Sequence, residues 1–168
     1  MSRKSYDNRT NSDLFSATYG SLVVQMIEDL PDMKNVNDEL FKLGFDMGQR
    51  LADDYFSRTN TRKCENMPEM ANSIGSKAFP LYLNANATVS KWSADGKEFS
   101  IIFEHISLMN YVQLPEKYSQ LKYLNILCGA IKGCLHMVQL KVEVAIVEDM
   151  FVGDAKNEIR IKYLHKIN

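Results

Sequence analysis

Residues 121–139 read LKYLNILCGAIKGCLHMVQ, and no other part of the chain says more about its architecture. Apolar residues recur there at steps of three and four, which predicts a helix. Gly129 and Gly133 lie inside this helix on one face, although each glycine costs roughly 1 kcal/mol relative to alanine. The pair indicates that another backbone passes unusually close. Lys122, Lys132 and His136 interrupt the run well short of the roughly 18 apolar residues of a membrane span, so we expect a buried helix.

The composition is that of an ordinary globular domain. The chain has 168 residues, 45% of them hydrophobic and 24% charged, which predicts one domain of average composition. Its net charge of −1 provides no global attraction to nucleic acid or to an anionic membrane. The cysteines, Cys64, Cys128 and Cys134, form neither a CxxC pair nor a Cys/His spacing. We therefore expect no metal site and, without an export signal, a reduced cytosolic compartment.

Four helices and a small antiparallel sheet account for most of the chain. The polar residues 1–12 predict a flexible N-terminal tail, and a single domain is expected over 13–168. Caps and apolar spacing predict helices over Leu14–Leu30, Asn35–Arg58, Pro68–Leu83 and Leu121–Gln139. Pro68 suits the first position of the third helix, whereas Pro80 predicts a kink within it.

The remaining segments alternate with the period of two that is typical of strands. A hairpin is expected to join Thr88–Trp92 to Glu98–His105 through Asp95-Gly96, a dipeptide that favours a tight turn. A short strand is expected over Tyr111–Leu114, and a closing hairpin over Val142–Ile146 and Ile159–Tyr163. This order predicts an α+β fold, in which four main helices pack with a small antiparallel β-sheet.

Cys64 is the strongest candidate for chemistry. It follows Arg62 and Lys63 in a polar loop just before the third helix. Neighbouring cations and a helix N-terminus both stabilise a thiolate, the nucleophilic form of cysteine. An activated acyl group could therefore modify Cys64, although an ordinary exposed thiol without a role is the commoner situation. Cys128 and Cys134 lie in the apolar fourth helix, where packing as small hydrophobic residues is expected.

The second helix also carries two glycines four positions apart, Gly44 and Gly48, with charged residues on its other faces. Such pairs let two backbones approach each other. We expect core packing for Gly129 and Gly133, and a dimer interface for Gly44 and Gly48. No catalytic site is expected, because the histidines form no motif with Cys64 and neither a carboxylate cluster nor a phosphate-binding glycine loop occurs.

An ordered set of short matches to a known family runs from Asp13 to Ile167. Its members are Leu14-Phe15, Thr18-Tyr19-Gly20, Gly44-Phe45, Gly48, Arg50-Leu51, Arg58, Asn60, Cys64, Ala78-Phe79, Tyr82-Leu83, Trp92, Glu98-Phe99-Ser100, Leu127-Cys128-Gly129, Gly133, Met137-Val138-Gln139 and Glu158-Ile159-Arg160. No match is decisive alone, but the ordered set is specific. On these residues the chain resembles the Bet-three-type core subunit of the transport protein particle (TRAPP), a vesicle-tethering complex.

The resemblance implies a subunit that dimerises through its N-terminal helices, with itself or with related TRAPP subunits. It implies a fatty acyl thioester, palmitate or similar, on Cys64, with the chain inside an apolar tunnel. Ile74 and Ala78 are the expected lining residues, and no other cofactor is expected. The resemblance further implies a non-enzymatic scaffold, since nucleotide exchange on an early-secretory Rab GTPase belongs to the assembled complex. Such a subunit would serve ER-to-Golgi transport, in the cytoplasm and peripherally at the cis-Golgi and endoplasmic reticulum.

Two residues depart from the family pattern. Lys63 stands where arginine is common, which keeps the charge but loses the planar fork, and Pro80 falls where the family helix is regular.

Two other functions stay open. One is a stand-alone acyl-binding or lipid-carrier protein that uses the same tunnel, and the other is a cysteine acyltransferase or thioesterase. Stoichiometric partners would separate a scaffold from a carrier, and repeated turnover of acyl-coenzyme A would indicate an enzyme.

Overall fold

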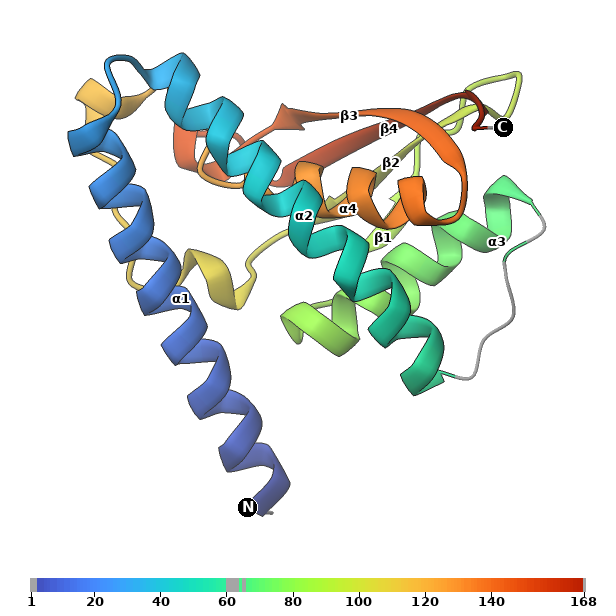
Figure 1. The fold of residues 1–168 in the computed structure, drawn as a ribbon, viewed down its shortest axis with the longest axis horizontal. Coiled ribbons are helices and arrows are strands. Elements are labelled where there is room, and N and C mark those ends of the chain that lie inside the picture. The colour runs from blue at the N-terminus through green and yellow to red at the C-terminus, as the bar shows by residue number, and fades with distance from the viewer. Residues whose placement is uncertain (1–2, 60–63, 65, 168) are drawn as a thin grey trace.

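The computed structural model describes residues 3–59, 64 and 66–167, with the side chains of the first helix described from Ser12 onward. Within them the expected α+β fold is confirmed (Figure 1). The helices are α1 (Arg3–Asp29), α2 (Met33–Thr59), α3 (Met67–Asn72), the π-helix η1 (Ser73–Leu83), α4 (Asn125–Met137) and the short 3₁₀ segments η2 (Ser107–Met109), η3 (Glu116–Tyr118) and η4 (Met150–Val152). The strands are β1 (Thr88–Ser90), β2 (Glu98–Phe103), β3 (Leu140–Glu148) and β4 (Asn157–Lys166).

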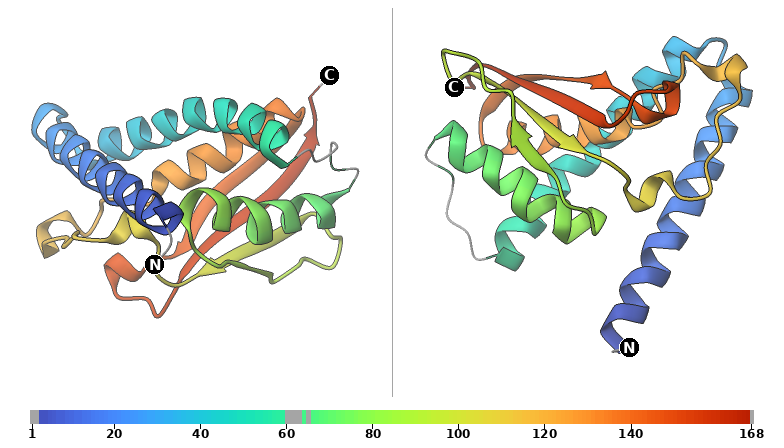
Figure 2. Two further views of the ribbon diagram at one scale, coloured as in Figure 1. Left: turned by 90° about the horizontal axis from the view of Figure 1, so that it is seen from below. Right: turned by 180° about the vertical axis from the view of Figure 1, so that it is seen from behind.

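The described strands form one antiparallel sheet in the order β1-β2-β4-β3. At its centre Phe99 of β2 pairs with Ile161 of β4, and Ile101 pairs with Ile159. These buried side chains share one face, because alternate residues of a strand point the same way. Helix α4 covers this face, and α2 lies over α4 (Figures 1 and 2). The core is therefore built between the sheet and α4.

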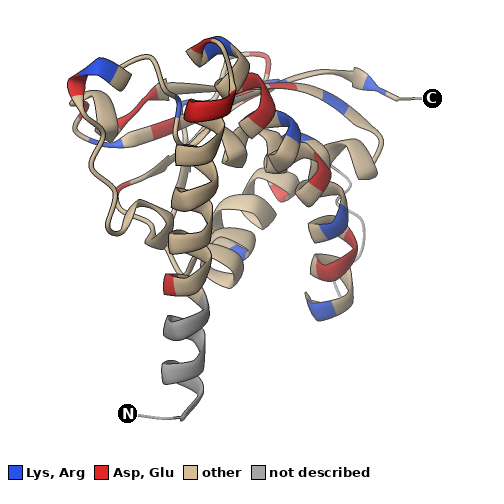
Figure 3. Ribbon diagram, turned by 60° about the vertical axis from the view of Figure 1, so that its left-hand side comes forward, with Lys and Arg blue, Asp and Glu red and all other residues tan. Residues whose placement is uncertain are grey.

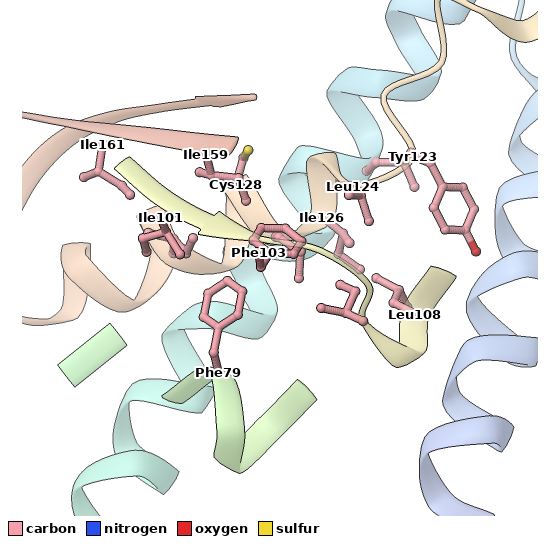
Figure 4. Packing of buried hydrophobic residues seen from close by; sticks show 14 of the residues in the cluster. Phe79, Ile101, Phe103, Leu108, Tyr123, Leu124, Ile126, Cys128, Ile159 and Ile161 are labelled. Atoms are coloured by element: carbon pink, nitrogen blue, oxygen red, sulfur yellow. The ribbon is translucent and has the colours of Figure 1, made fainter. Parts of the chain in front are cut away.

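The segment that follows α3 also contributes to this core. Phe79 of η1 points toward Phe103 of β2, and their ring centroids lie 5.2 Å apart (Figure 4). Cys128 of α4 is fully buried near Ile159, so its expected packing role is confirmed. Burial raises the pKa of the Cys128 thiol to about 12, which keeps it protonated and unreactive at neutral pH.

Helices α2 and α4 cross with their backbones in direct contact. A Cβ atom added at Gly129 would lie 2.0 Å from the carbonyl oxygen of Phe41. One added at Gly133 would lie 2.1 Å from the carbonyl oxygen of Phe45. Both distances are far shorter than a carbon–oxygen contact allows, so only glycine fits without moving the backbones. The expected close approach at Gly129 and Gly133 is confirmed, and the neighbour is α2.

The glycines of α2 take part in the same crossing. A Cβ atom at Gly44 would lie 2.0 Å from the carbonyl oxygen of Ile126, and one at Gly48 would lie 2.1 Å from that of Ala130. Both glycines are therefore buried against α4 of their own chain. The expected use of Gly44 and Gly48 in a dimer interface is corrected, because their open side is already filled by α4.

Helix α1 splays away from α2 along one side of the domain (Figures 1 and 2). It begins at Arg3 instead of near Leu14, so the helix extends into residues expected to form a tail, whose flexibility stays a prediction. Among the described residues, two side-chain hydrogen bonds join the helix to the rest of the domain. The Ser16 hydroxyl donates to the carbonyl oxygen of Ser107 at 2.8 Å, and the Tyr19 hydroxyl donates to that of Tyr123 at 2.5 Å.

The outer side of α1 is uncharged and uncovered, with exposed apolar side chains between polar ones such as Thr18, Ser21 and Gln25. No charged residue occurs between Leu14 and Ile27, and the described part of the helix is correspondingly tan in Figure 3. Exposed apolar side chains lie along it, namely Leu14 (66% exposed), Phe15 (43%), Leu22 (37%) and Val24 (56%). We call these four residues the α1 face. None of the described helices combines the length and hydrophobicity required to cross a bilayer.

The strand expected over Tyr111–Leu114 is absent from the described residues, where this segment is irregular. Both edges of β2 are already paired, one with β1 and the other with β4. Tyr111 also has a φ of +64°, which is outside the extended conformation of a strand. The local alternation predicted a strand, but the segment pairs with none of the described strands.

The third helix changes its backbone hydrogen-bonding pattern at Ser73. Pro68 lies in the first turn of α3, as expected, and from Ser73 the helix continues as the π-helix η1 with Pro80 inside. In an α-helix the Pro80 ring would clash with the carbonyl group four residues earlier. In a π-helix the hydrogen bonds instead reach five residues back, which widens the turn. Pro80 thus lies within a π-helix instead of the regular helix of the family pattern, and the kink expected at Pro80 stays a prediction.

Candidate functional site

An apolar cavity of about 510 Å³ lies between the helices and one end of the sheet. Its walls come from the C-terminal half of α2, from α3 and η1, from α4 and from the ends of β3 and β4. Apolar residues that line it include Leu51, Met70, Phe79, Leu127, Ile131 and Leu135. The volume falls in the range of about 300–1,000 Å³ that is typical of small-molecule pockets. A space of this size and lining suits a mainly hydrocarbon ligand.

Cys64 lies on the wall of this cavity together with Ile74 and Ala78. The Cys64 side chain is partly buried, and its Sγ lies 3.5 Å from the Oγ of Ser73, the first residue of η1. The structure thus brings together the three residues that the sequence singled out for an acyl group and its tunnel. A chain attached at Cys64 can enter an apolar space without crossing solvent.

The segment after Cys64 is held by a helix cap. The Asn66 side-chain oxygen accepts from the backbone N–H of Glu69 at 2.9 Å, and its Nδ2 donates to the Glu69 carboxylate at 2.9 Å. The first bond caps the start of α3, and the second holds the Asn66 and Glu69 side chains together.

The polar side chain of Tyr82 on the cavity wall is satisfied within the protein. Tyr82 of η1 donates its hydroxyl hydrogen to the Asp54 carboxylate at 2.7 Å. Arg58 donates to the same carboxylate at 2.7 Å and 2.8 Å, and this hydrogen bond is the main cause that lowers the pKa of Asp54. Desolvation and the bond to Asp54 raise the pKa of Tyr82. The Tyr82 hydroxyl is therefore committed to α2 and unavailable to a ligand.

A second cysteine, Cys134 of α4, also lines the cavity. Its thiol donates to the carbonyl oxygen of Gly48 at 3.0 Å, and burial raises its pKa to about 11. A thiol with this pKa is almost entirely protonated at neutral pH and is a poor nucleophile. Its expected role as simple core packing is thus incomplete, because Cys134 also faces the cavity. The sequence carried no signal for this, since Cys128 and Cys134 have the same apolar surroundings.

Arg62 and Lys63, the expected thiolate-stabilising residues, lie outside the described residues, and their role stays a prediction. Among the residues that the structure describes, no group of three His, Cys, Asp or Glu side chains could hold a metal ion.

Tyr55 of α2 lines the cavity and was not singled out from the sequence. Its position one turn after Leu51, on the same face of the helix, was the available signal.

Comparison with known proteins identifies related chains along nearly the full length. The family model described as transport protein particle (TRAPP) component matches residues 15–162. The chain is 38% identical over 167 residues to the trafficking protein particle complex subunit BET3 of Saccharomyces cerevisiae, covering 96% of this chain and 86% of the relative. It is also 38% identical to subunit 3 from Dictyostelium discoideum, covering 91% of this chain and 83% of that one.

A solved structure resembles the fold closely. It is the crystal structure of a trafficking protein particle complex subunit 3 from Naegleria fowleri covalently bound to palmitic acid. The two chains are 39% identical and superpose with a TM-score of 0.91, covering 95% of this chain and 98% of that chain. The arrangement of helices and sheet described above is therefore shared with that protein.

Proposed function

This chain belongs to the transport protein particle (TRAPP) component family, and from that premise we propose that it is a scaffold subunit of a vesicle-tethering complex. The family match over residues 15–162 is the observation that carries the proposal. In this role the chain acts by assembly, and nucleotide exchange on an early-secretory Rab GTPase belongs to the whole complex. It acts in ER-to-Golgi transport, bound peripherally to the cytosolic surface of the early secretory membranes.

The α1 face supports a partner subunit on this side of the domain. Its four apolar side chains are exposed and no charge interrupts them. Burying such a surface against a related helix is favourable, because each Å² of apolar area that leaves water contributes about 25 cal/mol of free energy. We propose that α1, together with the neighbouring part of α2, pairs with a related TRAPP subunit or with a second copy in an interface of standard size, about 1,600 Å² in total.

We expect the double substitution Leu14→Glu and Val24→Glu to remove the partner subunit while leaving the domain folded. Two carboxylates on the α1 face would be desolvated without counter-charges, which is unfavourable in an interface. Affinity purification of the tagged protein from cells should return stoichiometric TRAPP subunits with the parent and few or none with the variant. Val147→Glu is the matched control, because Val147 is an exposed valine of β3, 53% exposed, and does not belong to the α1 face. Full recovery of partners by the double variant would refute this interface, and a parent that returns no partners would favour the stand-alone acyl carrier.

We further propose that Cys64 carries a long-chain acyl thioester whose hydrocarbon occupies the cavity. The position of Cys64, Ile74 and Ala78 on one apolar wall supports this, and so does the covalent palmitic acid of the Naegleria fowleri relative. Each methylene group that leaves water contributes about 0.8 kcal/mol. The modification therefore acts mainly on stability and assembly, since a single buried chain leaves nothing to anchor the protein in a membrane.

Intact mass spectrometry should detect an acyl adduct on the purified protein that neutral hydroxylamine removes, because hydroxylamine cleaves thioesters. Cys64→Ser should abolish the adduct. Cys134→Ser should leave it unchanged, because the Cys134 thiol lines the same cavity with a pKa of about 11. An adduct that survives in Cys64→Ser and disappears in Cys134→Ser would reverse the assignment. No adduct in the parent, even after incubation with palmitoyl-coenzyme A, would refute acylation.

A further inference from the structure

Among the described residues that line the cavity, Tyr55 has a buried hydroxyl oxygen without a hydrogen-bond partner. Tyr55 lies near the C-terminal end of α2, and its ring packs edge-on against Phe56 at a centroid distance of 5.8 Å. Its hydroxyl oxygen is inaccessible to solvent and makes no hydrogen bond within the described part of the chain. A buried hydroxyl group normally has a partner, because leaving it unpaired sacrifices its hydrogen bond to water. This exception lies on the wall of a space large enough for a ligand.

The other polar groups along the wall are already accounted for. Tyr82 donates to Asp54, Cys134 donates to the carbonyl oxygen of Gly48, and Asn66 caps α3. The Ser73 hydroxyl lies against the Cys64 sulfur. Tyr163 and Lys166, at the sheet end, are partly or fully exposed, so water can satisfy them. Tyr55 is therefore the residue of the described wall that has a buried, unused hydrogen-bond donor.

The ligand that fits this arrangement is almost wholly apolar and carries one hydrogen-bond acceptor. An acyl chain joined to Cys64 has this character, because its sole polar group is the thioester carbonyl. That carbonyl carbon is bonded to the Cys64 sulfur, so its oxygen must lie at the Cys64 part of the cavity. Tyr55 projects into the same cavity from the last turns of α2, the helix that leads into the Cys64 loop.

We propose that the Tyr55 hydroxyl donates a hydrogen bond to the carbonyl oxygen of the acyl thioester on Cys64. This inference rests on the proposed acylation and adds a second point of attachment to it. Cys64 holds the acyl group covalently, and Tyr55 orients its carbonyl, so that the hydrocarbon is directed along the apolar wall. Tyr55 thereby distinguishes an acyl group from a plain alkyl chain, which offers no acceptor.

The carbonyl stretching band reports this bond directly. The parent and the isosteric variant Tyr55→Phe are loaded with [1-¹³C]palmitoyl-coenzyme A, and the isotope-shifted thioester band is recorded by infrared difference spectroscopy. The band should move to higher wavenumber in Tyr55→Phe, because the carbonyl loses its donor. Tyr82→Phe is the matched control in the same cavity, and its band should stay at the parent position because its hydroxyl is engaged by Asp54. An identical band in the parent and Tyr55→Phe overturns the inference.

The unacylated protein provides a second readout that also detects a misfolded variant. Unacylated Tyr55→Phe should melt at or above the temperature of the unacylated parent, because the substitution removes a buried hydroxyl without a partner. A clearly lower melting temperature would show that the hydroxyl already serves the free protein, and it would overturn the inference. Failure of the acylation itself is distinguishable, since the parent would then show no hydroxylamine-sensitive ¹³C band, and the inference would fall with it.

Discussion

Gly129→Leu and Gly133→Leu should each cost the protein most of its stability, and even Gly129→Ala should lower it by about 3 kcal/mol or more. The reason is the crossing of α2 and α4, where a Cβ atom at Gly129 would lie 2.0 Å from the carbonyl oxygen of Phe41. A flexible side chain could rotate away, but a backbone carbonyl within a helix can move only with its helix. Separating α2 from α4 would also open the core and the cavity, because both helices line it.

Thermal unfolding followed by circular dichroism measures this effect. For a chain of this length, about 3 kcal/mol corresponds to a fall of roughly 6–12 °C in Tm. Gly20→Ala is the matched control, since it is also a glycine in a helix and an added Cβ would meet only the Tyr123 hydroxyl at an ordinary 3.7 Å. That variant should be as stable as the parent. Parent-like melting of Gly129→Ala would mean that the two backbones do not touch.

Ala78→Leu should exclude the acyl chain while leaving Cys64 intact. Ala78 lies on the cavity wall, and a leucine there would place three additional carbon atoms in space that the hydrocarbon needs. A close-packed protein interior has no spare volume to absorb them. We expect the occupancy of the hydroxylamine-sensitive adduct to fall at least about tenfold. A tenfold change corresponds to about 1.4 kcal/mol, which is less than the burial of two methylene groups contributes.

Intact mass spectrometry under the conditions used for Cys64→Ser gives the occupancy. Lys77→Leu serves as the control, because it introduces the same side chain at the neighbouring position, which is exposed and does not line the cavity. It should keep the parent occupancy. An Ala78→Leu protein that is acylated as fully as the parent would show that the chain does not run past this wall, even if Cys64 is the attachment site.

Local patterns were sufficient to predict most of the helices and strands and to single out Cys64 as the main candidate residue. Apolar spacing predicted α2 and α4, and the Asp95-Gly96 turn predicted the pairing of β1 with β2, because helix period and turn chemistry depend on neighbouring residues. The chain neighbours of Cys64 marked it as reactive, and the structure places it at the apolar cavity. The Tyr111–Leu114 segment shows the limit, since its residues alternate like a strand but pair with none of the described strands.

The glycines of α2 and α4 show which structural features follow from neighbouring residues and which depend on how the chain folds. Their spacing alone indicated two close backbone approaches, because a glycine inside a helix is unfavourable unless something needs the space. The spacing did not indicate that both glycine pairs belong to one helix crossing, in which Gly44 and Gly48 face the helix that carries Gly129 and Gly133. Helical spacing places residues on a face, and only contact between distant segments determines what that face meets. The same holds for Tyr55 and Cys134, whose place on the cavity wall arises where α2, η1 and α4 come together.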